Sequence, residues 1–147
     1  MADSPVPVGR EVSFTKTVSE SDVYLFAGIT GDFSPNHVNQ TYMENSVWGR
    51  RMVHGALLIG FVSTASTLAI ADTRDGGGAT PVAVGMDRVR FLKPVFIGDT
   101  VTVRYRIESF DDERQRTHAK VEVSNQDGVL VAVADHLLQW VDNAKDS

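Results

Sequence analysis

The chain has 147 residues, a formal net charge of −5 and no cysteine. This length fits one domain with a substantial core and argues against a second domain. The acidic balance argues against nucleic acid and anionic membrane as main partners. The missing cysteine excludes disulfides, thiolate metal sites and a cysteine nucleophile, and it suits a reducing compartment, so we expect a cytoplasmic protein.

The chain begins with a segment that predicts no regular structure. Residues 1–9 contain two prolines and no periodic pattern, which indicates a flexible tail before a single domain over residues 10–141. The segment also lacks the basic and apolar regions of a secretory signal. Residues 11–18 then alternate as a strand does. Ser19 and Asp22 predict a helix start, and Gly28 and Gly31 predict its end.

The middle of the chain predicts a turn and a central helix. Pro35 lacks an amide hydrogen and restricts Ser34 to extended conformations, so residues 32–37 predict a turn. A short helix over 40–46 and a loop over 48–51 follow. Residues 53–71 contain no proline and carry apolar side chains on nearly every face, which predicts an enclosed helix. Its histidine, serines and threonines favour a buried helix of a soluble fold over a bilayer helix.

The remainder of the chain predicts strands. After a glycine-rich loop at 72–80, residues 81–91 alternate but change phase near Met86, which indicates a bulge. Strands are also predicted over 100–108, 116–125 and 129–141, before a polar tail at 142–147. The short turns between them, including Asp127-Gly128, predict an antiparallel sheet wrapped on the long helix, an α+β fold. Because one such layer leaves a sheet edge and part of the helix uncovered, we expect dimerisation.

One stretch carries a family resemblance. Residues 24–37, YLFAGITGDFSPNH, resemble the signature of the MaoC-like R-specific enoyl-CoA hydratases, which has an aromatic residue, a Gly-Asp pair and then Asn-Pro-(Leu or Ile)-His. Further matches are Arg50 before Val53-His54-Gly55, the helix with Ser63, and FLKPVFIGDT at 91–100. The resemblance covers about residues 10–141. It implies a hot-dog fold, a homodimer or a higher homo-oligomer of dimers, and reversible syn hydration of a trans-2-enoyl-CoA to a (3R)-3-hydroxyacyl-CoA.

The resemblance also implies roles for particular residues. The catalytic acid and imidazole of the family fall on Asp32 and His37, and its oxyanion-binding amide falls on Gly55. A serine that hydrogen-bonds near the catalytic aspartate falls on Ser63. Because CoA is part of the substrate, no cofactor is expected, and an acyl-CoA thioester is the expected partner.

Two positions depart from the family pattern. Ser34 stands where the family usually has Asn, and we expect it still to cap the turn. Asn36 stands where the family has Leu or Ile, which puts a polar group beside His37 and leaves the polarity and length of the acyl group open.

These residue types suit the chemistry. Hydration of an enoyl thioester needs a base for the water, an acid for C2 and donors for the charge on the thioester oxygen. An aspartate and a neutral histidine can hold one water between them, although the sequence does not assign which group protonates C2. Gly55 at a helix start supplies an unpaired amide and the positive end of the helix dipole, and a glycine allows the thioester close.

The other histidines have simpler interpretations. His54 is expected to brace the loop before the helix rather than act as a ligand, and His118 falls on the polar face of its strand. Asp135-His136 is a second acid and imidazole pair, but neighbouring strand residues point to opposite faces, so no joint site is expected there. Four histidines without an HxH or HExxH spacing argue against a metal site.

Several alternatives stay open at this stage. Arg88, Arg90 and Lys93 meet CoA phosphates or lie on a solvated strand edge. Four residues before the core helix line an acyl tunnel or only pack: Tyr42, Met43, Val47 and Trp48. Two other functions compete with hydration. One is a hot-dog thioesterase, which releases free CoA, and the other is a non-catalytic acyl-CoA-binding partner subunit, suggested by the altered Ser34 and Asn36.

Overall fold

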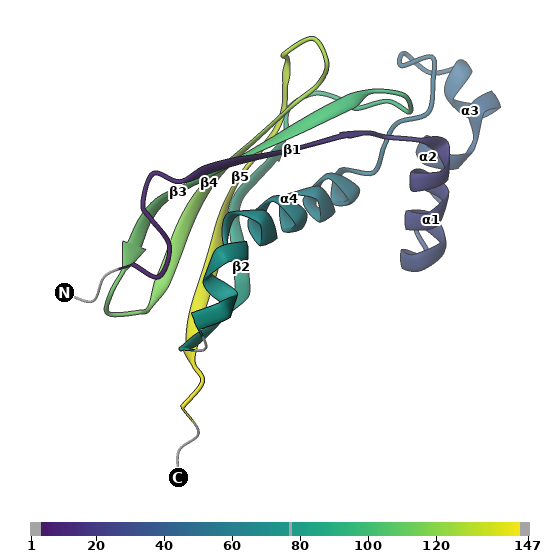
Figure 1. Cartoon of the computed structure of the whole chain (residues 1–147). Coiled ribbons are helices and arrows are strands. Elements are labelled where there is room, and N and C mark those ends of the chain that lie inside the picture. The colour runs from purple at the N-terminus through teal and green to yellow at the C-terminus, as the bar shows by residue number, and fades with distance from the viewer. Residues whose placement is uncertain (1–3, 77, 145–147) are drawn as a thin grey trace.

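The computed structural model describes residues 4–76 and 78–144, with the backbone alone at 74–76. Five antiparallel strands form one sheet in the order β1 (Glu11–Thr17), β3 (Thr100–Asp111), β4 (Arg116–Ser124), β5 (Leu130–Asp142) and β2 (Ala79–Phe91). The sheet bends around the long helix α4 (Gly55–Ala69), as Figure 1 shows. This arrangement confirms the predicted α+β hot-dog fold. Among the described residues, no helix has the length and apolar character needed to cross a membrane.

The first helix fixes where the candidate site begins. In α1 (Glu20–Thr30), the Ser19 hydroxyl accepts a hydrogen bond from the Asp22 amide, and the Asp22 carboxylate accepts one from the Ser19 amide. This reciprocal cap confirms the predicted helix start. Gly31 ends the helix at φ 84°, a left-handed conformation that glycine adopts at little cost, whereas Gly28 lies within the helix.

Two short helices follow at the same end of the molecule. The predicted turn at 32–37 runs into α2 (Pro35–Val38), because a proline in the first helical position loses no hydrogen bond. In α3 (Gln40–Glu44), the Asn39 side chain accepts from the Tyr42 amide at 2.9 Å. Figure 1 shows α1, α2 and α3 beyond the N-terminal end of α4, so the 32–37 segment lies where that helix begins.

The central helix buries one side against the sheet. Its inward side chains come from Leu58, Phe61, Val62, Ala65, Ser66 and Ala69. The exposed residues of the helix are mostly small or polar, with one leucine near its C-terminal end: Ala56, Gly60, Ser63, Thr64, Thr67 and Leu68. The prediction that the helix is enclosed is therefore wrong for a single chain, because the sheet covers only one side of it. This exposed side agrees with the expectation that a single sheet layer leaves part of the helix uncovered.

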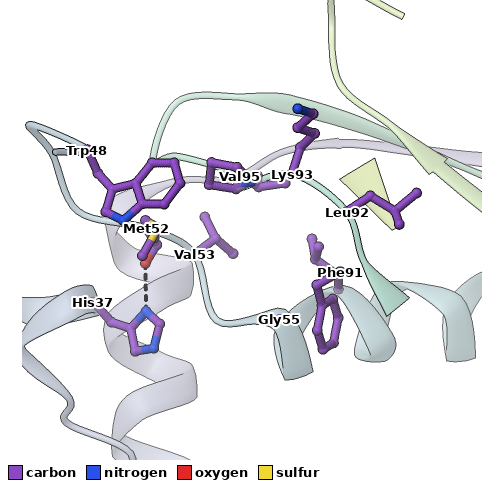
Figure 2. Close-up of a pocket in the computed structure, with 11 residues that line it drawn as sticks. His37, Trp48, Met52, Val53, Gly55, Phe91, Leu92, Lys93 and Val95 are labelled. Atoms are coloured by element: carbon purple, nitrogen blue, oxygen red, sulfur yellow. Dashed lines mark hydrogen bonds between the residues drawn. The ribbon is translucent and has the colours of Figure 1, made fainter. Parts of the chain in front are cut away.

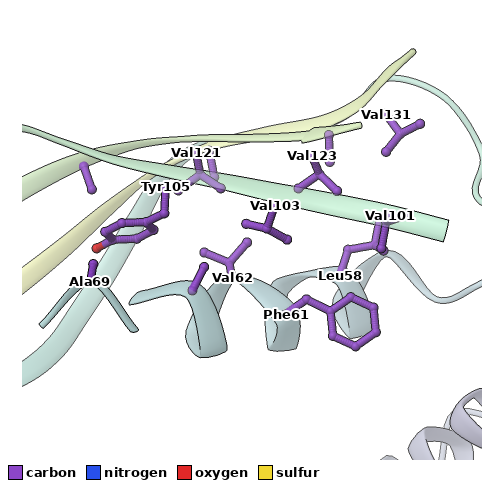
Figure 3. Close-up of a cluster of buried hydrophobic side chains, with 14 of the residues drawn as sticks. Leu58, Phe61, Val62, Ala69, Val101, Val103, Tyr105, Val121, Val123 and Val131 are labelled. Atoms are coloured by element: carbon purple, nitrogen blue, oxygen red, sulfur yellow. The ribbon is translucent and has the colours of Figure 1, made fainter. Parts of the chain in front are cut away.

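The core lies between α4 and the inner face of the sheet. Figure 3 shows valines of β3, β4 and β5 pointing toward Leu58, Phe61 and Val62. Inward residues alternate along β3, where Val101, Val103, Tyr105 and Ile107 are at most 1% exposed, which confirms the predicted strand. Each such large apolar side chain stabilises the fold by about 1.5–3 kcal/mol.

Strand β2 forms one edge of the sheet and is irregular. Its register with β5 shifts between Ala83 and Gly85 and again between Asp87 and Arg90. Arg88 lies between the second pair of residues at φ 50°. These shifts confirm the bulge predicted near Met86, and they bend the strand before it reaches the site at Phe91.

The terminal segments differ in part from the prediction. Residues 1–3 of the predicted N-terminal tail lie outside the described residues. The rest of that tail packs on the domain, because Val6 is fully buried in the core and the Gly9 amide donates to the Ile107 carbonyl at 2.8 Å. In the predicted glycine loop, Ala71–Gly76 form a 3-10 helix, and residue 77 is not described. The tail predicted from residue 142 begins as the end of β5, and residues 145–147 are not described.

Candidate active site

His37 is held in one orientation by the main chain. It lies half-buried in α2, and its Nδ1 is 2.7 Å from the carbonyl oxygen of Met52, the contact drawn in Figure 2. A carbonyl oxygen only accepts hydrogen bonds, so Nδ1 carries the proton. The neutral ring therefore has its lone pair on Nε2. His37 presents an acceptor, or a general base, on the side away from Met52.

Asp32 lies just after the glycine that ends α1. Its Oδ1 accepts from the Ser34 amide at 3.2 Å, a local turn typical of aspartate, and half of its side chain is exposed. A carboxylate oxygen of Asp32 and one ring nitrogen of each of His37 and His54 all lie within 4.8 Å of one another. Since a hydrogen bond to water spans about 2.8 Å, one water molecule can contact two of these groups at once.

His54 is the buried member of this group. Its Nε2 is 3.0 Å from the main-chain carbonyl oxygen of Asp32, so Nε2 carries the proton and donates. Its ring stacks on His37 with centroids 3.7 Å apart and an angle of 24°, and it meets the Phe26 ring at 4.7 Å. His54 therefore braces the turn that carries Asp32, whereas the sequence predicts that it braces the loop before the core helix.

The three side chains are of types that bind metal ions, but their arrangement does not suit chelation. Ligand nitrogens donate in the plane of the imidazole ring, and the stacked rings of His37 and His54 lie in nearly parallel planes. Each ring also has one nitrogen on a main-chain carbonyl. The geometry favours an acid and base pair over a metal centre, and the absence of a metal stays a prediction.

A cavity of about 370 Å³ opens beside His37. Its lining is mainly apolar and comes from His37, Trp48, Met52, Val53, Gly55, Leu58, Phe91, Leu92, Lys93, Pro94 and Val95, of which nine are labelled in Figure 2. His37 and Gly55 thus border the same space. Asp32 is not part of this lining and approaches His37 from outside it.

Gly55 is the first residue of α4, and its amide makes no hydrogen bond within the described part of the chain. A Cβ atom at this position would lie 2.8 Å from the Phe91 ring, closer than real Cβ contacts, so any larger residue would have to displace that ring. The cavity therefore borders the positive end of a helix dipole, where an unpaired amide favours an oxygen that gains negative charge.

Three of the other predicted residues do not join this group. Ser63 lies on the exposed side of α4, and among the described residues it makes no hydrogen bond with Asp32. Ser34 begins α2, but its hydroxyl does not cap the helix. The expectation of a serine cap is wrong because the turn is instead closed by the Asp32 carboxylate and by the Ser34 carbonyl, which accepts from His37. Asn36 is half-buried outside the cavity lining.

The structure shows which of the residues considered for the acyl and CoA groups line the cavity. Of the four residues before the core helix, Trp48 alone lines the cavity; Tyr42 and Val47 are exposed and Met43 is in the core. Of the three cations, Lys93 alone lines it, while Arg88 forms an ion pair with Asp135.

Two contributors to the site are not predicted from the sequence. The Met52 carbonyl that holds His37 has no side-chain signal at all. Phe91, which packs on Gly55, belongs to a stretch that matches the family, and the two adjacent apolar residues Phe91 and Leu92 break the strand alternation. That break is the signal that could have placed Phe91 at the site.

Known proteins resemble this chain over most of its length. An (R)-specific enoyl-CoA hydratase of Rhodospirillum rubrum is 40% identical over 108 residues, which are 73% of this chain and 69% of that protein. A 3-hydroxybutyryl-CoA dehydratase of Methylorubrum extorquens is 33% identical over 125 residues, 84% of this chain and 74% of that protein. The solved structure of an (R)-hydratase from A. caviae shares the fold, with a TM-score of 0.79 at 23% identity, covering 91% of this chain and 96% of that one. The model of the MaoC-like domain matches residues 3–129, and the chain belongs to the MaoC-like family.

Proposed function

We propose that this protein is an R-specific enoyl-CoA hydratase, which adds water reversibly to a trans-2-enoyl-CoA and gives a (3R)-3-hydroxyacyl-CoA. One observation carries the proposal. His37, whose Nδ1 is held by the Met52 carbonyl, has a ring nitrogen within 4.8 Å of an Asp32 carboxylate oxygen, and it lines a cavity that also borders the unpaired Gly55 amide. The two relatives named as a CoA-thioester hydratase and dehydratase support the reaction class.

The proposed reaction uses these groups on one side of the double bond. Asp32 and His37 hold one water, and one of them takes its proton as the water oxygen bonds to C3. A proton held by the pair is delivered to C2, so the net change is one C–O bond, one C–H bond and the loss of the double bond. Both additions come from the same side, which makes the hydration syn. Negative charge that develops on the thioester oxygen is stabilised by the Gly55 amide and the helix dipole.

The lining of the cavity suggests the part of the substrate that it takes. Its side chains are apolar except for His37 and Lys93, and Asn36 lies outside it, which favours an apolar acyl group. Lys93 is exposed and is the cation of the cavity lining that a CoA phosphate could contact. We propose that the reaction needs no cofactor, because its proton transfers are within reach of the two side chains.

We propose a homodimer as the working form. The edge strand β2 and the exposed side of α4 are surfaces that a second copy would cover. Light scattering on the purified protein checks this, and a monomer at micromolar concentration would contradict it. The cytoplasmic location expected from the composition stays a prediction.

The test is a spectrophotometric screen of short, medium and polar trans-2-enoyl-CoA thioesters, followed by chiral analysis of the product. We expect loss of the conjugated thioester with formation of the (3R) product alone. Release of free CoA, detected with a thiol reagent, would instead indicate a thioesterase. A rise in melting temperature with CoA esters and no product would indicate a non-catalytic binding subunit.

A further inference from the structure

His54 connects three parts of the site. It is the residue before Gly55, so its main chain leads directly into the first turn of α4. Its Nε2 donates to the main-chain carbonyl of Asp32 at 3.0 Å, and its ring lies flat against His37 at 3.7 Å. The same residue therefore contacts the turn that carries the acid, the plane of the base and the start of the helix that offers the amide.

Packing alone does not account for an imidazole at this position. The side chain of His54 is 2% exposed, and its Nδ1 has no hydrogen-bond partner among the described residues. A buried nitrogen without a partner is unfavourable, and an apolar ring of similar shape would avoid it. Since Nε2 makes the contact with Asp32, the hydrogen bond is the feature that an apolar ring would lose.

We propose that His54 is a positioning residue for the hydration reaction. Its N–H group holds the main chain of Asp32, and its ring face holds the imidazole of His37 with a ring nitrogen within 4.8 Å of the carboxylate. This inference rests on the proposed function, because it assigns Asp32 and His37 the acid and base roles. Among the described residues, the titratable side chains that stack on His54 or pair with it are His37 and Asp32.

Two substitutions separate the two contacts. His54→Gln keeps an amide N–H near the place of Nε2 but removes the ring, whereas His54→Phe keeps the ring face but removes the donor. Displacements of catalytic groups by about 1 Å cost up to roughly a hundredfold in rate. We expect each variant to lower kcat by about 10- to 100-fold while KM changes by less than about threefold. His118→Phe, the same chemical change on β4, serves as the matched control and is expected to keep its kcat.

Melting curves distinguish positioning from loss of fold. The proposal requires that kcat of the folded variants falls and that the pH dependence of kcat shifts, because the environment of His37 changes. If one variant fails to fold, the other still carries the test. Values of kcat within twofold of the parent in the folded variants, with an unchanged pH profile, would overturn the proposal.

A second measurement does not depend on activity. Nitrogen NMR of the histidines reports which ring nitrogen of His37 carries the proton. We expect the Nδ1–H form in the parent protein and in His54→Phe. In His54→Gln we expect a mixture of both forms, because without the stacked ring His37 can turn away from the Met52 carbonyl that holds its Nδ1–H. An unchanged His37 spectrum in His54→Gln would overturn the stacking role. If the parent protein hydrates no enoyl-CoA, the proposed function fails, while this measurement still decides whether His54 positions His37.

Discussion

The chain contains two pairs of an acid and an imidazole, and their surroundings differ. Asp32 and His37 are five residues apart on a turn and a short helix, and their polar atoms come within 4.8 Å. Asp135 and His136 are adjacent on β5 and point to opposite faces of the sheet. Asp135 pairs with the exposed Arg88, whereas His136 is buried with its Nδ1 2.8 Å from the Tyr105 hydroxyl.

The difference shows that nearness in sequence does not make a site. A strand alternates its side chains between the two faces of the sheet, so Asp135 lies on the outer face, where Arg88 covers it, and His136 is buried on the inner face. Burial lowers the pKa of His136 and raises that of Tyr105, which keeps both groups neutral. The turn after α1 does the opposite and brings an acid and a base to one place beside a cavity.

The largest expected effect comes from breaking the first pair. Asp32→Asn and His37→Ala are each expected to lower kcat for enoyl-CoA hydration by about a hundredfold or more, because each removes a proton-transfer group. Turnover with crotonyl-CoA and the melting temperature are measured together. Asp135→Asn makes the same chemical change as Asp32→Asn in the second pair and is expected to keep its activity. Near-normal turnover in both site variants across a panel of substrates would refute the assignment.

The second prediction concerns the Gly55 amide at the start of α4, which lies near the pair Asp32 and His37. Gly55→Ala places a Cβ atom 2.8 Å from the Phe91 ring, so ring or helix must move. We expect about a hundredfold loss of kcat from this displacement. Because alanine keeps the amide, the double variant with Phe91→Ala is expected to recover part of the activity. Full activity of the single variant would argue against a close approach at Gly55.

The third prediction uses pH to test the second pair. The pKa of His136 is lowered from 6.5 in the fold, so below pH 6.5 the unfolded chain binds a proton that the folded chain does not. The stabilising contribution of neutral His136 is therefore fully present above pH 6.5. Below this pH the free energy of unfolding falls, by at most about 1.4 kcal/mol for each pH unit from this one group. Urea unfolding at several pH values between 7.5 and 5 measures the slope. His136→Asn is expected to flatten it, and parallel pH curves for the two proteins would contradict the prediction.

The smallest expected effect is the loss of stability when the ion pair between Asp135 and Arg88 is removed. Asp135→Asn removes the partner of Arg88, whose side chain is 75% exposed, so no charge is left buried. We expect a loss of stability of less than about 1 kcal/mol, which decreases further at high salt. A loss of several kcal/mol in chemical denaturation would show that this surface pair contributes as a buried one does.

The sequence predicts the fold well where a periodic pattern of side chains corresponds to one buried face and one exposed face. The alternation in β3, the serine cap of α1 and the sheet wrapped on one helix are confirmed. The prediction is wrong where a sequence pattern does not show which other elements cover a segment. The apolar pattern of residues 53–71 suggests an enclosed helix, yet the sheet reaches one side only. The two prolines near Val6 suggest a flexible tail, yet tertiary packing buries Val6 in the core.

The site is predictable only in part for a related reason. The family resemblance implies the roles of Asp32, His37 and Gly55, and local turns and a helix start determine where these residues lie. The contacts of Phe91 with Gly55 and of the Met52 carbonyl with His37 join segments distant in sequence, and a main-chain oxygen is the same in every residue. Likewise, whether Ser34 caps its turn depends on competition with the nearby Asp32 carboxylate.

The Met52 carbonyl has a consequence for how this family can vary. Because the atom that fixes the protonated nitrogen of His37 belongs to the peptide backbone, no single side-chain replacement deletes it. The side chain of residue 52, which lines the cavity, can therefore change the shape of the cavity while its carbonyl still holds the imidazole. If the proposed reaction is correct, substrate choice and proton transfer depend on separate parts of this one residue.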